Sequence, residues 1–158
     1  MDHDMDTLTL TRPDDWHLHL RDGAHMQSVV ADTARQFARA IIMPNLRPPV
    51  TTTGLALAYR QRILDSLPAA SGFQPLMTLY LTDNTTPEEI ARAKASGMVH
   101  GVKLYPAGAT TNSDSGVTDI HKCHAALEAM QDHDVPLLVH GGVTHPLVGV
   151  FAREQAFL

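Results

Sequence analysis

The sequence contains a single cysteine, few aromatic residues and no long hydrophobic run. Cys123 has no second cysteine to pair with, which excludes an internal disulfide and fits a reducing compartment. The longest apolar stretches, such as AIIM and PLLV, are far shorter than the roughly 20 residues that span a bilayer. The acidic start MDHDMDTLTL lacks the apolar core of a signal peptide. These absences predict a soluble, cytoplasmic protein.

Blocks of basic residues are also absent. The 158 residues include 12 Lys and Arg against 17 Asp and Glu, a formal net charge of −5. No stripe of basic and aromatic residues could follow a phosphate backbone, so nucleic acid is not an expected partner. With 44% hydrophobic and 18% charged residues, the chain has the composition of a globular domain and is long enough to bury one core.

Short apolar segments alternate with helical patterns along the chain. We expect strands at residues 8–10 continuing into 17–20, and at 40–43, 75–81, 99–104 and 136–140. We expect helices near residues 25–38, 54–66, 87–96, 118–132 and 146–156. Such alternation is typical of βα units and a largely parallel sheet.

Two of the predicted helices have clear local signals. Before residues 87–96, Thr86 is the expected N-cap, Pro87 occupies the first helical position and Glu89 completes a capping box. In residues 118–132, one helical face is predicted to be apolar. That face consists of Ile120, Cys123, Leu127 and Met130.

A parallel α/β chain can form an open doubly wound sheet or a (β/α)₈ barrel. An open sheet that binds a nucleotide usually has a glycine-rich turn after its first strand, and HLHLRDG contains none. A barrel needs eight strands and about 250 residues. With five predicted strands, either the sheet is open or the chain contains part of a barrel.

Polar side chains occur where the predicted strands end. His17 and His19 stand two residues apart, so in a strand both imidazoles point to one face. Asn45, Lys103 and His140 lie at the ends of later strands. Because the carboxyl ends of parallel strands meet at one rim, these side chains should come together there. Three imidazoles and a lysine indicate a metal site, since neutral imidazole suits zinc.

Each of these residues also has a structural interpretation. A histidine pair such as His17 and His19 is often a surface feature, His140 could be satisfied in the core, and Lys103 could extend its ammonium group into solvent. Lysine fits a metal site only without its charge. Burial lowers a lysine pKa, and the neutral amine can then capture carbon dioxide as a carbamate, an anion able to bridge two metal ions.

Six segments, in order along the chain, carry a family resemblance. They read RPDDWHLHLRDG, MPNLRPPVTT, YRQRILD, PLMTLYLTD, KLYPAGATTNSDSGVT and PLLVHG. Together they resemble the bacterial dihydroorotases, members of the amidohydrolase superfamily. The resemblance implies a (β/α)₈ TIM barrel of the metal-dependent hydrolase type, with about five of the eight βα units in this chain. Residues 1–158 are then the expected N-terminal portion of a single barrel domain whose C-terminal strands are absent.

The resemblance also implies a centre with two Zn²⁺ ions per full-length subunit. By motif match, His17 and His19 would hold the first zinc, carboxylated Lys103 would bridge both ions, and His140 would bind the second. Arg21 and Asn45 match residues that bind the substrate carboxylate, and an arginine fork suits that group. Thr110 and Thr111 match a mobile loop that closes over the substrate. The full substrate-binding set would be His19, Arg21, Asn45, Thr110, Thr111 and His140.

The implied activity is the reversible cyclisation of N-carbamoyl-L-aspartate to L-dihydroorotate in pyrimidine (UMP) biosynthesis. The metals would activate a water and polarise the amide carbonyl. The proton-shuttling aspartate and a further zinc-binding histidine would lie beyond Leu158, so no catalytic residue is predicted in this chain, and residues 1–158 alone are expected to be inactive. The expected partner is the small-molecule substrate, with no nucleic acid and no membrane, and a homodimer is compatible with the resemblance.

One departure and three alternatives stay open. The segment HGGVT has Gly141 and Gly142 where many relatives have an acidic residue. Another cyclic amidase, such as a hydantoinase or allantoinase, would use the same metals but gives no reason for Arg21 with Asn45, and a substrate panel would distinguish it. A non-catalytic fragment or subunit, or a plain α/β domain without metal, would be distinguished by a zinc count.

Overall fold

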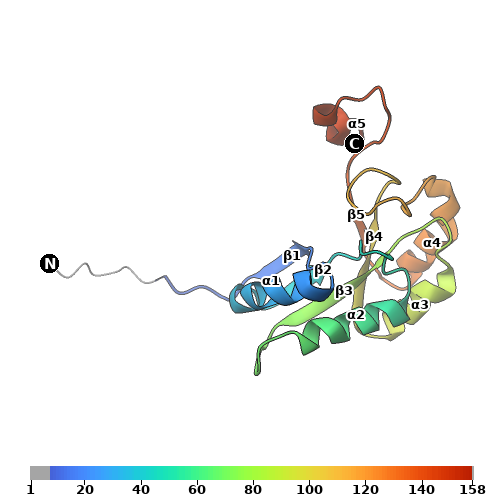
Figure 1. Cartoon of the computed structure of the whole chain (residues 1–158). Helices are drawn as coiled ribbons and strands as arrows, with labels where there is room; N and C mark the ends of the chain where they lie inside the picture. Colours follow the sequence, from blue (N-terminus) through green and yellow to red (C-terminus); the bar gives the residue numbers. More distant parts are fainter. Residues whose placement is uncertain (1–7, 158) are drawn as a thin grey trace.

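Five short apolar segments form one parallel sheet, with helices between the strands (Figure 1). The computed structural model of the chain describes residues 8–157. The strands are β1 (Asp14–Leu18), β2 (Arg39–Ile42), β3 (Gln74–Tyr80), β4 (Val99–Leu104) and β5 (Leu137–Val139). The helices are α1 (Gly23–Gln36), α2 (Thr53–Asp65), α3 (Pro87–Ala95), α4 (His124–Asp132) and α5 (Arg153–Phe157), with 3₁₀ turns at Ile120–Cys123 and Val150–Ala152.

The strand order decides between the two predicted architectures. Each strand pairs in parallel with the strand before it, in the order β1-β2-β3-β4-β5. An open doubly wound sheet reverses its order at a switch point, whereas a barrel adds every strand on the same side. The sheet therefore confirms the barrel prediction, with five of the eight strands of a full barrel in the described residues.

Alternate residues of each strand belong to two different faces. On β4, Val102 and Leu104 pack into the hydrophobic core with buried residues of the helices, and Lys103 between them points to the opposite face. At β1, Leu18 and Leu20 contribute to the same core. The helices cover one face of the sheet, and the other face, here called the inner face, carries the polar strand-end residues. The core also includes Cys123, 1% exposed, as the sequence predicted.

The N-terminal strand is shorter than the sequence predicted. Residues 8–10 form no strand, and Leu8 and Leu10 are exposed. The reason is that the ladder between β1 and β2 begins with Asp14 opposite Arg39, so the preceding residues have no strand to pair with. At the other end, β1 stops at Leu18, so residues 19 and 20 of the predicted strand lie just beyond it.

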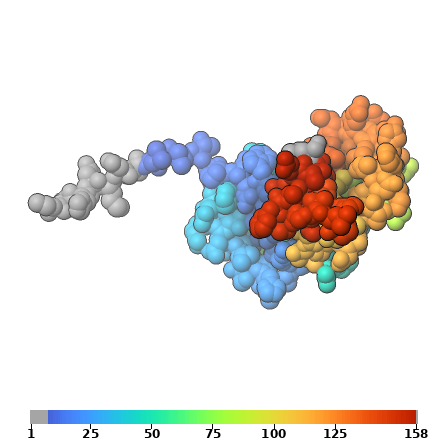
Figure 2. All heavy atoms as spheres, turned by 90° about the horizontal axis from the view of Figure 1, so that it is seen from above, coloured from blue at the N-terminus to red at the C-terminus, as the bar shows by residue number. Residues whose placement is uncertain are grey.

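Two predicted helices also differ from the structure. Residues 118–132 begin as the 3₁₀ turn at Ile120–Cys123, which has a different period from an α-helix and leaves Ile120 43% exposed. The predicted helix at 146–156 is reduced to α5 and the turn before it, since Pro146 and Gly149 disfavour helix in the first half. This C-terminal segment projects beyond the sheet at the end where the strands finish (Figure 1), and Figure 2 looks down on it.

Glu89 joins two helices instead of completing its own capping box. Thr86 does cap α3, since its hydroxyl accepts a hydrogen bond from the Glu89 amide at 3.3 Å. The Glu89 carboxylate turns to α2, where it accepts from both the amide and the hydroxyl of Thr53, each at 2.6 Å. Burial raises the pKa of Glu89, but hydrogen bonds from Thr53 and Arg92 outweigh burial and hold that pKa below its usual value. Glu89 thereby fixes the start of α2, which follows the loop from β2.

Replacing Glu89 with alanine should lower the free energy of unfolding by about 2 kcal/mol, because both Thr53 donors lose their acceptor. The folded-state pKa of Glu89 is depressed, so its stabilisation is present above the unfolded-state pKa and is lost as the pH falls through the folded-state pKa. Urea unfolding of parent and variant should therefore differ at neutral pH and converge in acid. Glu88→Ala, at the exposed neighbouring position, is the control, and equal losses in both variants would contradict the assignment.

Within residues 8–157, none of the helices has the length and hydrophobicity of a membrane-spanning segment.

Candidate metal centre

His17 and His19 place their imidazoles side by side at the end of β1. Their Nε2 atoms lie 3.1 Å apart, and their ring centroids are separated by 5.1 Å. Two nitrogen ligands of one tetrahedral zinc, each at about 2.0–2.1 Å from the ion, lie about 3.3 Å apart. The pair therefore has nearly the separation that a shared metal ion requires.

Both imidazoles are held toward their neutral form. Burial lowers the pKa of His17, and the charge of Lys103 adds to this effect. Burial also lowers the pKa of His19, where the charge of Arg21 adds to it. Neutral imidazole is the form that binds a metal. The electrostatic effect of Lys103 on both imidazoles also shows that this lysine, far away in the sequence, lies near the pair.

Lys103 is buried on the inner face of β4, with 3% of the residue exposed. Its Nζ donates to the carbonyl oxygen of Val139 at 3.2 Å and lies 5.4 Å from the ring centroid of Tyr105. No Asp or Glu in the described part of the chain forms an ion pair with it. Burial lowers the pKa of Lys103. Burial without an acidic partner favours the uncharged amine, which is the form that can become a carbamate.

His140 follows β5 at the same rim. Its backbone amide donates to the carbonyl of Leu104 at 3.0 Å, and its ring centroid lies 6.1 Å from that of Tyr105. Within residues 8–157, no three His, Cys, Asp or Glu side chains are close enough to hold one metal ion. The sequence prediction assigns His140 to a different ion from His17 and His19, so it does not require all three imidazoles in one group.

Arg21 leaves the strand geometry two residues after His19. Its backbone adopts the left-handed conformation, with φ of 62°, and its carbonyl accepts a hydrogen bond from Tyr59 Oη at 2.5 Å. The alternation of β1, which ends at Leu18, therefore does not set the direction of this side chain. Nη1 of the guanidinium is buried and has no hydrogen-bond partner in the described structure. An unpaired buried donor of this kind is suited to a carboxylate ligand.

Asn45, Thr110 and Thr111 meet where β2 and β4 end. Asn45 is 2% exposed, and its Nδ2 donates to the carbonyl oxygen of Thr111 at 2.9 Å. The amide of Thr110 donates to Ser113 Oγ at 2.9 Å, which braces a loop of turns without helix or strand, as the sequence predicted. The structure thus brings the predicted carboxylate-binding asparagine and the predicted substrate loop together.

Two tyrosines on the inner face were not identified from the sequence. Tyr80 of β3 is the register partner of Lys103, and its ring stacks on Tyr105 with centroids 5.1 Å apart. The Tyr105 hydroxyl is buried without a hydrogen-bond partner in the described residues, and burial raises its pKa. A signal was available, because Tyr105 stands two residues after Lys103 and so shares its face.

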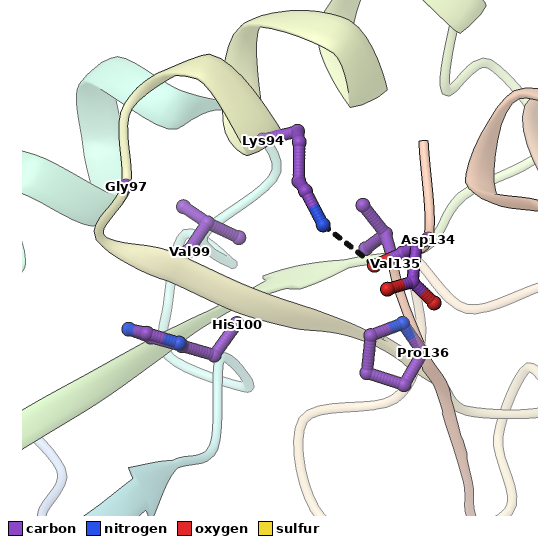
Figure 3. A pocket seen from close by; sticks show the side chains of 7 residues that line it. All are labelled: Lys94, Gly97, Val99, His100, Asp134, Val135 and Pro136. Carbon is purple, nitrogen blue, oxygen red and sulfur yellow. Dashed lines mark hydrogen bonds between the residues drawn. The ribbon is translucent and has the colours of Figure 1, made fainter. Parts of the chain in front are cut away.

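A separate pocket of about 300 Å³ lies at the opposite end of β4 (Figure 3). Its lining residues are Lys94, Gly97, Val99, His100, Asp134, Val135 and Pro136. Lys94 Nζ donates to the carbonyl oxygen of Asp134 at 2.8 Å, just past the end of α4. The contact satisfies a carbonyl group near a helix terminus, which is a structural role remote from Lys103.

Comparison with known proteins shows that this chain is similar to dihydroorotases in sequence and in fold. The chain is 71% identical over 154 residues to a dihydroorotase of Ralstonia nicotianae, covering 98% of this chain and 45% of that protein. The crystal structure of dihydroorotase from Campylobacter jejuni superposes with a TM-score of 0.84 at 42% identity, and that of the Saccharomyces cerevisiae dihydroorotase in complex with 5-fluoroorotic acid with 0.82 at 34%. Each superposition covers 92% of this chain and 42% of the other.

The chain thus spans a little under half the length of these relatives. The sequence profile of the amidohydrolase family matches residues 14–157, which include the histidine pair of β1, the buried lysine of β4 and the histidine after β5. On this match, and with the strand order described above, the chain belongs to the amidohydrolase family.

Proposed function

We propose that the full-length protein containing this chain is a dihydroorotase, which interconverts N-carbamoyl-L-aspartate and L-dihydroorotate in pyrimidine (UMP) synthesis in the cytoplasm. The observation that carries the proposal is the buried Lys103, which has no acidic ion-pair partner in residues 8–157 and lies near His17 and His19. The Ralstonia nicotianae protein, 71% identical, has the name dihydroorotase. A rim with a lysine that can form a carbamate and an arginine with a free donor suits a cyclic amide bearing a carboxylate.

The donor set suits two Zn²⁺ ions. His17 and His19 would hold one ion, His140 would hold the other, and Lys103 would bridge them as a carboxylated side chain. When bound, the ions would polarise the amide carbonyl and lower the pKa of a water. The support from this chain is the 3.1 Å between the Nε2 atoms of His17 and His19, together with the lowered pKa values of both imidazoles.

The remaining side chains would bind and orient the substrate. Arg21 would bind the substrate carboxylate through two parallel N–H donors of its guanidinium group, and Asn45 would add an amide donor. Thr110 and Thr111 would cover the bound ligand and exclude water. His19 and His140 complete the proposed substrate-binding set, and the proton-shuttling aspartate is proposed to come from outside residues 1–158.

We also propose that residues 1–158 form the N-terminal portion of one barrel domain. In the described residues, β1 and β5 each pair on one side only. Trp16 at β1 is 62% exposed, and Leu137 and Val139 of β5 are 37% and 41% exposed. The further strands of a closed barrel would pair with both edges and cover these apolar side chains.

A substrate panel tests the proposed function. The zinc-supplied full-length protein should turn over L-dihydroorotate with a kcat/KM more than about a hundredfold above that for hydantoin or allantoin, which lack the carboxylate for Arg21. Residues 1–158 assayed in parallel should be inactive, because an open half of a barrel lacks the remaining ligands. Preference for hydantoin or allantoin, or no turnover of any substrate by the zinc-loaded protein, would refute the proposal.

A further inference from the structure

The loop that carries Thr110 and Thr111 is a preformed unit. We call residues 107–117 the rim loop. At its base, the amide of Ala107 donates to the carbonyl of Val117 at 3.0 Å, and the amide of Val117 donates to the carbonyl of Tyr105 at 2.8 Å. A Cβ added at Gly116 would lie 2.3 Å from the Tyr105 carbonyl oxygen, so only glycine fits this approach. The base is therefore fixed, and any movement of the rim loop concerns its tip.

The tip is attached to the end of β2 through two asparagines. Asn112 Nδ2 donates to the carbonyl oxygen of Asn45 at 3.0 Å, and Asn45 Nδ2 donates to the carbonyl oxygen of Thr111 at 2.9 Å. Each side-chain amide thus bonds to the backbone of the other segment. Tyr80 Oη adds a bond of 3.3 Å to the carbonyl oxygen of Asn112. All three contacts lie on the inner face, next to the proposed carboxylate-binding residues.

The backbone of Asn112 explains the choice of residue. Its φ is 56°, in the left-handed region that asparagine tolerates better than most residues other than glycine. In this conformation its carbonyl meets Tyr80 and its side chain meets Asn45. A second link, between Arg47 Nη2 and Asp114 Oδ2 at 3.5 Å, joins two exposed side chains, and surface pairs of this kind stabilise little.

We propose that Asn112 is a positioning residue that holds the tip of the rim loop against Asn45 before the substrate binds. It would preset the Asn45 amide and both loop threonines in the arrangement that receives the substrate carboxylate. The apparent affinity for substrate would then depend on the fraction of molecules in which the tip is docked. The kinetic consequence rests on the proposed function, whereas the docking itself does not.

Hydrogen exchange of the full-length protein without substrate tests the docking. Asn112→Gly keeps the left-handed backbone and removes only the side chain. Amides at the tip should then exchange about three to ten times faster, the factor expected from loss of one net hydrogen bond. Amides of α3 should keep the parent rate. Ser115→Ala, at an exposed position of the rim loop, is the matched control and should behave like the parent.

A second variant separates the effect of losing the hydrogen bond from the effect of the added backbone flexibility of glycine. Asn112→Asp retains the size and backbone preference of asparagine, but a carboxylate oxygen facing the Asn45 carbonyl cannot donate. It should accelerate exchange at the tip as Asn112→Gly does. Parent-like exchange in both variants, or faster exchange in Asn112→Gly alone, would overturn the proposal.

Kinetics provide the second readout. Both Asn112 variants should raise KM for dihydroorotate by about three- to tenfold at unchanged zinc content, because a residue that only presets the loop acts on binding. A lowered kcat with unchanged KM would overturn the positioning role. If the zinc-loaded parent does not turn over dihydroorotate, the proposed function fails, and hydrogen exchange still decides the docking.

Discussion

Lys103→Ala in the zinc-supplied full-length protein is expected to lose both metal ions and nearly all turnover of dihydroorotate. Lys103 is buried, has no acidic ion-pair partner in residues 8–157 and lies near the histidine pair, so its carboxylated form is the proposed bridge between the ions. Bound metal supplies several kcal/mol of transition-state stabilisation, so kcat/KM should fall on the order of a thousandfold or more. Elemental analysis for zinc and a dihydroorotate assay measure the two losses.

Lys94→Ala is the matched control for this experiment. Lys94 lies at the opposite end of the sheet, where it donates to the Asp134 carbonyl oxygen. The control should retain both zinc ions and its activity. Carbon-13 NMR of the parent supplied with labelled bicarbonate should also show a carbamate signal that Lys103→Ala lacks. Two zinc ions per chain in Lys103→Ala, or a plain amine in the metal-loaded parent, would contradict the proposed bridge.

Arg21→Ala should impair substrate binding without removing metal. The buried Nη1 of Arg21 has no partner in the described structure and is free to donate to a carboxylate. Loss of a charge-assisted hydrogen bond costs about 1.5–3 kcal/mol, which corresponds to roughly a tenfold to hundredfold fall in kcat/KM. The effect should appear mainly in KM, at unchanged zinc content. Steady-state kinetics together with zinc analysis provide the measurement.

Two further variants control the Arg21 experiment. Arg21→Lys retains the charge but not the fork, so its kcat/KM should lie between those of the parent and Arg21→Ala. Arg35→Ala, at an exposed position of α1, should match the parent. Alanine and arginine both carry a Cβ, so each bears the left-handed backbone at position 21 at a similar cost. The Arg21→Ala substitution therefore adds no backbone strain of its own. Loss of zinc with retained substrate affinity would show that Arg21 is misassigned as a substrate group.

Local patterns were enough to predict much of the candidate site. The spacing of His17 and His19 placed two imidazoles together, and the position of Lys103 at the end of β4 placed it at the same rim. The loop that carries Thr110 and Thr111 was expected from the family resemblance, and the structure has a loop there. Their roles as metal ligands and substrate-binding groups stay predictions.

The sequence by itself determined which residues share a face and in what order strands and helices alternate, because a side chain's direction along a strand follows from a period of two. Only the tertiary structure decided the strand order, the attachment of Glu89 to Thr53 and the docking of Asn112 on Asn45, 67 residues apart. The physical reason is that each of these depends on which distant segments pack together. Local propensity and periodicity act within a few residues, whereas a hydrogen bond across the sheet forms only once the whole arrangement exists.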